Sequence, residues 1–317
     1  MGAFGLLSID LGAVASALGG ANPWLLAVAL VAYALGQTLS GAMWAGCQSA
    51  GGVRGMPLPT ALGLHWISRA ACELLPASLG EVIRVALVRR HPAGAAAGGW
   101  RIAGGLGGYK AIDAAVTGVA VLAIAVAVPL PGPAAGLRWT AIGAVVVVGI
   151  VALIWRYGPA HRVGALLPAC ARRAAARLGE GAGILADGPA ARRAALIAVA
   201  ALVARIVSLG ALLAAFDAPA GAAALAFSVI VLAGVIPLVP GGAGTREVIL
   251  VPALALANGV PTSTAIAFSL SVQALALSTS LVLGAAALAW LSPRLRAHRV
   301  EAGPLPIPRP ALAAAPA

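Results

Sequence analysis

Long apolar runs, separated by short polar or Pro/Gly-containing stretches, make up most of the chain. A helix needs about 20 apolar residues to cross the hydrocarbon core of a bilayer, and four runs reach that length. They cover about residues 23–47, 102–130, 194–216 and 262–291, and a fifth apolar run covers 139–155. Helices satisfy their own backbone polar groups in lipid. The pattern therefore predicts an all-α fold, a polytopic integral membrane helix bundle of about six to eight membrane segments.

Two further apolar stretches contain interruptions that a simple membrane helix lacks. Residues 60–88 are apolar enough to enter the membrane, yet Pro76 and Gly80 interrupt them, and charged residues lie on both sides. Residues 220–258 contain a Pro/Gly-rich stretch at 240–244. Because Pro and Gly interrupt helices, we expect two broken or re-entrant helices, one in each of two pseudo-repeated halves of the chain.

The remaining segments differ in composition from these runs. Residues 1–20 predict an interfacial helix or a poorly ordered start, and 21–292 form the predicted transmembrane domain. Within it, 156–193 is the most polar internal stretch, a predicted basic cytoplasmic loop with an amphipathic surface helix near 163–178. The Pro/Ala-rich tail 293–317 is expected to be disordered.

Composition places the whole chain in a membrane. Of its 317 residues, 61% are hydrophobic and 9% are charged, whereas about 25% of the residues in an average soluble domain are charged. The mean hydropathy is +1.00. A soluble core of this size could not bury so much apolar surface, whereas lipid can.

The net charge of +12 raises the question of a nucleic-acid partner, but the arginines are distributed differently. They cluster between apolar runs, near 54, 84–101, 156–193 and 294–299, as in cytoplasmic loops that face anionic lipid. We expect no nucleic-acid partner, and cytoplasmic basic loops and tail. Even numbers of crossings separate the clusters if both interrupted stretches are hairpins. The bias toward Ala, Gly, Arg and Pro predicts a GC-rich bacterial genome, hence a multi-pass protein of the bacterial plasma (inner) membrane.

Residues for covalent or metal-assisted chemistry form no recognisable set. Three cysteines and four histidines are irregularly spaced, without a zinc or disulfide pattern. The sequence also lacks a nucleotide-binding loop and a Ser/His/Asp set. We therefore expect no cofactor, no metal and no enzymatic activity. An intramembrane enzyme is the least favoured of the functional hypotheses.

Charged residues inside the apolar stretches are the main candidates for a site. A charge at the bilayer centre costs about 3 kcal/mol on insertion scales. Three acid–base pairs have spacings that place both partners on one helix face. They are Arg69 with Glu73, Glu81 with Arg84, and Lys110 with Asp113. The adjacent Arg246 and Glu247 point in different directions and need partners elsewhere.

Two interpretations of these charges stay open. One is a polar cavity that receives a charged headgroup or phosphate. The other is a set of structural ion pairs that lock helices together, or charges that lie at the membrane interface. Arg205, inside the run 194–216, fits either a role in such a cavity or a side chain that extends from a helix end to the interface.

The two interruptions share a pattern, an aliphatic residue followed by Pro-x-x-x-Gly, then an acid and an arginine. The backbone-break residues are Pro76 and Gly80 in the first, and Pro240, Gly241, Gly242 and Gly244 in the second. Backbone groups freed at such breaks survive in a membrane only when they are buried in protein or line a cavity. Broken helices at corresponding positions of two halves indicate a transporter's binding site.

At these residues the sequence resembles the lysylphosphatidylglycerol synthase transmembrane-region family, also called flippase-like integral membrane proteins. The first signature is Leu74-Leu75-Pro76-Ala77-Ser78-Leu79-Gly80-Glu81-Val82-Ile83-Arg84. The second is Pro240-Gly241-Gly242-Ala243-Gly244-Thr245-Arg246-Glu247, followed by Gly259-Val260-Pro261. The resemblance covers about residues 20–290 and implies a membrane region associated with moving a modified lipid across the bilayer.

The chain departs from the family's pattern at one point between the signatures. The family usually shows Glu-Arg-x-x-Asp there, and this chain has Tyr109-Lys110-Ala111-Ile112-Asp113. A lysine supplies the charge of an arginine but lacks its planar fork. Bifunctional relatives add a soluble aminoacyltransferase domain, and about 26 residues follow residue 291. We expect no lysyl transfer by this chain alone.

Translocation of an amphipathic lipid is the leading hypothesis. The lipid would be an anionic phospholipid, an aminoacylated one or a polyprenyl-linked lipid. Glu81, Arg84, Arg246 and Glu247 would form the site at the two breaks, supported by Arg69, Glu73, Lys110 and Asp113, with arginines on phosphate and glycines admitting the headgroup. The alternative is a non-transporting accessory or scaffold protein for a cell-envelope enzyme, a membrane-enzyme partner bound through loop 156–193.

Overall fold

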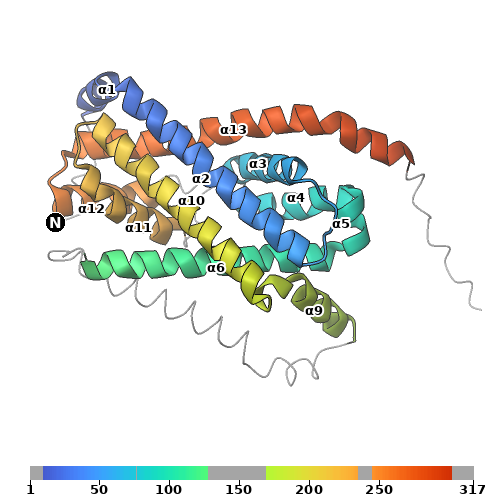
Figure 1. Cartoon of the computed structure of the whole chain (residues 1–317). Helices are drawn as coiled ribbons and strands as arrows, with labels where there is room; N and C mark the ends of the chain where they lie inside the picture. Colours follow the sequence, from blue (N-terminus) through green and yellow to red (C-terminus); the bar gives the residue numbers. More distant parts are fainter. Residues whose placement is uncertain (1–9, 76, 128–168, 235–244, 302–317) are drawn as a thin grey trace, which may run out of the picture.

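A computed structural model describes residues 10–75, 77–127, 169–234 and 245–301, and every regular element in these ranges is a helix (Figure 1). The predicted all-α membrane bundle is therefore confirmed. The helix predicted at 139–155 lies outside the described residues.

Four long helices form the frame of the bundle, and each is apolar enough over a sufficient length to cross a membrane. Helices of 28 residues are about 42 Å long at about 1.5 Å per residue, which exceeds the hydrocarbon thickness of about 30 Å. The four are α2 (Pro23–Ala50), α6 (Gly99–Ala127), α10 (Gly188–Ala215) and α13 (Thr262–Glu301).

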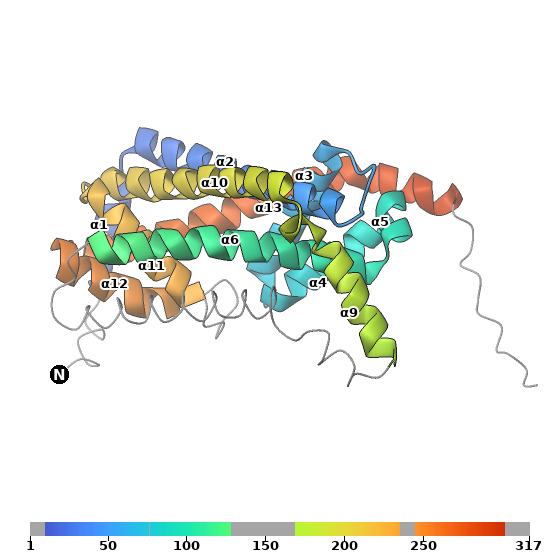
Figure 2. The ribbon, with the colours of Figure 1, turned by 60° about the horizontal axis from the view of Figure 1, so that its bottom comes forward.

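Helices α2 and α10 lie side by side and antiparallel along their whole length (Figures 1 and 2). The backbone N–H of Asn22, the N-cap residue of α2, donates to the backbone carbonyl of Ala215 at the end of α10, at 2.9 Å. Further in, the Ser208 hydroxyl donates to the Ala29 carbonyl at 2.7 Å. Gly36 permits this approach, since a Cβ there would lie 3.2 Å from the Ala201 carbonyl oxygen.

The first interrupted stretch is a re-entrant hairpin of α3 (Leu58–Leu74) and α4 (Ala77–Arg90). Helix α3 runs antiparallel to α13, because Gly63 packs on Leu291 and Gly284 packs on the Trp66 carbonyl. Neither helix, with 17 and 14 residues, spans a bilayer alone. The chain reverses at mid-depth and returns to the end from which it entered, so the predicted broken helix is confirmed.

Gly80 has a different role from the expected one. It lies inside α4, and a Cβ there would come within 2.9 Å of the Cys72 Cα on α3. Its missing side chain therefore brings the two arms of the hairpin together. Pro76 lies outside the described residues.

The second interrupted stretch approaches from the opposite end of the bundle. A short 3₁₀ turn, η4 (Ala220–Ala222), packs on Gly210 near the end of α10 and leads into α11 (Ala223–Gly234). Helix α12 (Thr245–Asn258) returns to the start of α13. The outer ends of α11 and α12 thus lie opposite the outer ends of α3 and α4 (Figure 1). Pro240, Gly241, Gly242 and Gly244 lie outside the described residues.

Basic residues gather at the end where α3 and α4 enter. Here α5 (Pro92–Ala97), α9 (Ala169–Gly181) and η3 (Gly183–Leu185) join the long helices, and α9 projects from the bundle (Figure 2). Arg101 of α6 forms an ion pair with Glu180 of α9. The exposed arginines at this end are Arg54, Arg89, Arg90, Arg172, Arg173, Arg177, Arg192 and Arg193. We call this the basic end, and α9 overlaps the predicted surface helix at 163–178.

The first and last described parts of the chain are helical. Residues 11–19 form α1 (Leu11–Gly19), whose first turn is capped by the Asp10 carboxylate accepting from Ala13 N–H at 3.0 Å. At the other end, α13 continues through Pro293 to Glu301, and the rest of the tail predicted at 293–317 lies outside the described residues. Pro293 cannot donate to the Ala289 carbonyl, but the Ser292 hydroxyl does so at 3.3 Å.

Close packing of α6 on α9 yields a stability prediction with a matched control. A Cβ at Gly104 would lie 2.8 Å from the Gly181 Cα, whereas a Cβ at Gly107 meets nothing within 4 Å. Gly104→Ala should lower the free energy of unfolding by about 1–3 kcal/mol through overpacking. Gly107→Ala should raise it by up to about 1 kcal/mol through helix propensity. Thermal unfolding in detergent compares them, and equal effects would contradict this packing.

Candidate functional site

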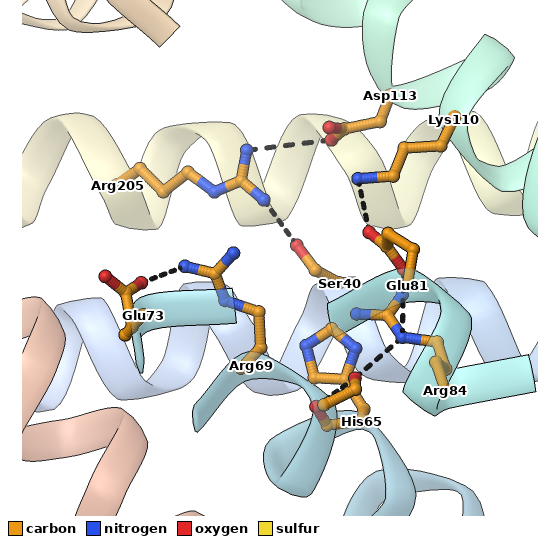
Figure 3. A network of polar contacts seen from close by, with 10 residues as sticks. Ser40, His65, Arg69, Glu73, Glu81, Arg84, Lys110, Asp113 and Arg205 are labelled. Carbon is orange, nitrogen blue, oxygen red and sulfur yellow. Dashed lines mark hydrogen bonds and ion pairs between the residues drawn. The ribbon is translucent and has the colours of Figure 1, made fainter. Parts of the chain in front are cut away.

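Charged side chains of α3, α4, α6 and α10 meet at mid-depth in the bundle, around Ser40 of α2 (Figure 3). Asp113 is the central residue of α6, 14 residues from Gly99 and 14 from Ala127, or about 21 Å from either end. Arg205 lies 10 residues before the last residue of α10, Ala215. Asp113 and Arg205 therefore lie far from both ends of their helices.

Arg69 and Glu73 form the first predicted pair. On α3, Arg69 Nη2 donates to Glu73 Oε1 at 2.6 Å, across one helical turn. The carboxylate is nearly buried and the guanidinium half-buried, and Tyr33 of α2 lies beside that guanidinium. The predicted i,i+4 pair is confirmed and lies at the inner end of α3, next to the break.

Arg84 is the most deeply buried charge, with 2% of its surface exposed. Its Nε donates to the Ser68 hydroxyl of α3 at 2.7 Å and lies 3.4 Å from Glu81 Oε2. The guanidinium also lies 5.3 Å from the ring centroid of Trp44 and 5.9 Å from that of Tyr109. The predicted Glu81–Arg84 pair is confirmed, and Arg84 joins the hairpin to α2 and α6.

The third predicted pair, Lys110 with Asp113, was wrong. Lys110 Nζ lies 2.8 Å from Glu81 Oε1 of α4, and Asp113 Oδ1 lies 3.6 Å from Arg205 Nη1 of α10. Helix α4 presents the acid Glu81 to α6, and α10 presents the base Arg205. Lys110 and Asp113 therefore each pair with a residue of another helix. Sequence spacing places the two residues on one face of α6 but carries no information about what that face contacts.

Arg205 belongs to the network, although its sequence position alone left its role open. Its Nη2 donates to the Ser40 hydroxyl of α2 at 2.6 Å, while Nη1 faces Asp113. The sequence signal for this role was the position of Arg205 in the middle of the apolar run 194–216. From there its side chain is too short to reach the membrane interface.

The network has more cations than acids. Four cations, Arg69, Arg84, Lys110 and Arg205, face three acids, Glu73, Glu81 and Asp113, so the net charge is 4 − 3 = +1. At an effective dielectric constant of about 20, opposite unit charges about 4 Å apart attract by about 4 kcal/mol. Ion pairing therefore offsets much of the cost of burying these groups, and it leaves one positive charge uncompensated.

Several buried nitrogens of the network have no hydrogen-bond partner. They are Arg69 Nε, Arg84 Nη1, Arg205 Nε, Trp44 Nε1 and both ring nitrogens of His65. His65 is completely buried beside Trp44, at 6.5 Å between ring centroids. An unpaired buried donor costs about 1–3 kcal/mol. The network thus has spare capacity to donate hydrogen bonds to an acceptor.

Of the second predicted cluster, the structure describes the side chain of Glu247. Glu247, in the first turn of α12, accepts from the Ser269 hydroxyl of α13 at 3.1 Å. Ser269 precedes Gly284, where α13 packs on α3, by 15 residues, or about 22 Å along the helix. The side chain of Arg246 lies outside the described part of the chain. Helix α13 therefore connects the two hairpins.

Metal ligands do not gather anywhere in the described residues. Within these ranges, no three His, Cys, Asp or Glu side chains come together in a way that would hold a metal ion. The chemistry available at the mid-depth network is thus charge pairing and hydrogen bonding by arginine, lysine and carboxylate groups.

A hydrophobic bundle with a re-entrant hairpin and buried ion pairs defines a class of multi-pass membrane protein, and sequence comparison identifies the family. The family described as "Lysylphosphatidylglycerol synthase TM region" matches residues 1–291. The chain belongs to this family and is an integral membrane protein. The match also includes residues 1–19, which the resemblance at the two signatures did not cover. No curated protein sequence matches the chain.

The observed partners of α6 lead to a prediction about energetic coupling. In a double-mutant cycle with Lys110→Met and Glu81→Gln, the coupling energy should be about 1 kcal/mol, because the two charges are in contact. The cycle with Lys110→Met and Asp113→Asn should give a value near zero. Denaturant unfolding in detergent supplies the free energies. A larger coupling energy for Lys110 with Asp113 than for Lys110 with Glu81 would instead support the pairing that sequence spacing predicted.

Arg84 should not tolerate replacement even by lysine. Arg84→Lys removes the planar group between the rings of Trp44 and Tyr109 and the geometry of the bond to Ser68. We expect a loss of about 2 kcal/mol in unfolding free energy. Arg90→Lys, an exposed position on the same helix, is the matched control and should change it by under about 0.5 kcal/mol. Similar losses of unfolding free energy for the two variants would contradict the specific contacts of the Arg84 guanidinium.

Proposed function

We propose that this protein moves phosphate-bearing amphipathic lipids across the bilayer. The observation that carries the proposal is the cation-rich network at mid-depth, where a headgroup in transit needs polar partners. A charged headgroup in hydrocarbon faces the same cost as a charged side chain. Side chains such as Lys110 and Arg205, partly accessible at that depth, would lower this cost by pairing with phosphate.

The arrangement of the two hairpins supports this function. The α3–α4 hairpin enters from the basic end, whereas α11 starts from the opposite end and α12 returns to it. Broken helices in two oppositely oriented halves surround the substrate sites of many transporters, and the halves move against each other around a fixed site. Such an arrangement exposes a mid-depth site to one side of the membrane at a time.

The residues of the network would divide this work. Lys110 and Arg205 would bind phosphate, because each is partly accessible and each lies on a long helix. Arg84 would hold the hairpin in place, since it is buried against two aromatic rings. Glu81 and Asp113 would hold the two cations in position between transport events.

The proposal also includes the membrane in which the protein lies and its role as a transporter without enzymatic activity. The basic end would face the cytoplasm of a bacterial cell at the plasma membrane, following the positive-inside rule. The chain would act as a transporter and not as an enzyme, since the network holds ion pairs and donors for binding. Its substrates would be anionic, aminoacylated or polyprenyl-linked lipids of that membrane.

One observation favours a second candidate function, that of an accessory protein. Helix α9 presents Arg172, Arg173 and Arg177 on its exposed surface, and it projects from the bundle at the basic end (Figure 2). Such a surface suits an acidic partner, such as a cell-envelope enzyme that the protein positions in the membrane. In that case the mid-depth ion pairs would serve stability alone.

Reconstitution into liposomes tests the first function against the second. Fluorescent phospholipids report movement between leaflets, and Lys110→Gln/Arg205→Gln should reduce the rate at least about tenfold, or about 1.4 kcal/mol. Arg172→Gln/Arg173→Gln removes the same charge from α9 and is the matched control, with an unchanged rate. Circular dichroism checks that both variants fold.

The opposite results have a clear meaning. Equal rates in the wild type and in Lys110→Gln/Arg205→Gln would show that the mid-depth cations do not carry the lipid. If the wild type moves none of the lipids and α9 variants lose a bound membrane enzyme, the accessory function replaces translocation.

A further inference from the structure

Each acid of the network already faces at least one of the protein's own cations, which bears on the charge of its ligand. Glu73 pairs with Arg69, and Asp113 faces Arg205. Glu81 is shared by two cations, Lys110 at 2.8 Å and Arg84 at 3.4 Å. Glu81 Oε2 has no hydrogen-bond partner, yet an incoming ammonium group would compete with one of the protein's own cations for any of these three carboxylates.

The cations, in contrast, have free capacity. Arg69, Arg84 and Arg205 each have at least one buried N–H without an acceptor. Lys110 has 55% of its side chain exposed and has an ion pair with Glu81 alone among the described residues, although an ammonium carries three donors. A phosphodiester brings acceptor oxygens and one negative charge. That charge equals the positive charge left over in the network.

We infer that the site selects an anionic phosphodiester headgroup and discriminates against the positively charged headgroup of an aminoacylated lipid. This inference rests on the proposed function and narrows its substrate class. Lys110 and Arg205 would contact the charged headgroup, because they are the partly accessible cations on the long helices α6 and α10 and each faces a single acid. Glu81 and Asp113 occupy the same cations when no headgroup does, so they act as internal competitors of phosphate.

Competition between lipids of different charge tests the inference on the reconstituted full chain. Three tail-labelled probes have net charges of −1, 0 and +1: phosphatidylglycerol, phosphatidylcholine and lysylphosphatidylglycerol. The wild type should move and bind phosphatidylglycerol at least about tenfold better than lysylphosphatidylglycerol, since one charge contact supplies that difference readily. Binding is measured separately, as lipid retained on protein in nanodiscs.

Variants that change the network's charge should shift this preference in opposite directions. Lys110→Gln lowers the net charge of the network to 3 − 3 = 0 and should make phosphatidylglycerol and lysylphosphatidylglycerol nearly equal as substrates. Lys110→Arg keeps the charge and should restore the preference for phosphatidylglycerol. Asp113→Asn gives 4 − 2 = +2 and should increase the preference. Arg90→Gln, exposed on α4, is the control and should leave it unchanged.

Each outcome separates the inference from the proposed function. Equal movement of all three lipids, or faster movement of lysylphosphatidylglycerol, supports translocation and overturns the charge selectivity. Preferential retention of phosphatidylglycerol without movement of any lipid supports the selectivity and rejects translocation. Inorganic phosphate is the last probe. If it displaces the lipid at equal concentration, the site is one for free phosphate, and the assignment to a lipid headgroup is overturned.

Discussion

Burial of charge in a nonpolar bundle is the constraint on which the rest of this structure depends. Seven charged side chains meet in the interior of the bundle, and each charge needs a partner because lipid offers none. Those partners come from four helices, so the ion pairs fix which helices are neighbours. From the hairpin of α3 and α4, Arg84 contacts Trp44 of α2 and Tyr109 of α6, and Glu81 pairs with Lys110 of α6.

Stability alone does not account for this arrangement. Apolar side chains of similar volume often stabilise a protein as well as buried ion pairs do, and the described network leaves several donors without acceptors. A network that retains unpaired donors at mid-depth is costly as a structural element and useful as a binding site. The same features that weaken the packing of the bundle thus support its proposed role in handling a phosphate group.

Helix α13 relates this network to the second hairpin. It packs on α3 through Gly284 and Leu291, and its Ser269 hydroxyl donates to Glu247 of α12. One helix therefore contacts both hairpins, which start from opposite ends of the bundle. In the proposed transporter, α13 is the helix through which a change in the position of one hairpin would reach the other.

Sequence by itself determined the class of the protein, its long helices, the broken helix before Pro76 and the pairs Arg69–Glu73 and Glu81–Arg84. These depend on hydrophobic length and on spacing within one helix, which are local properties of the chain. Only the tertiary structure decided the partners of Lys110 and Asp113, the inclusion of Arg205 and the packing role of Gly80. Spacing along a helix shows which residues share a face, whereas the neighbour of that face depends on how the whole chain packs.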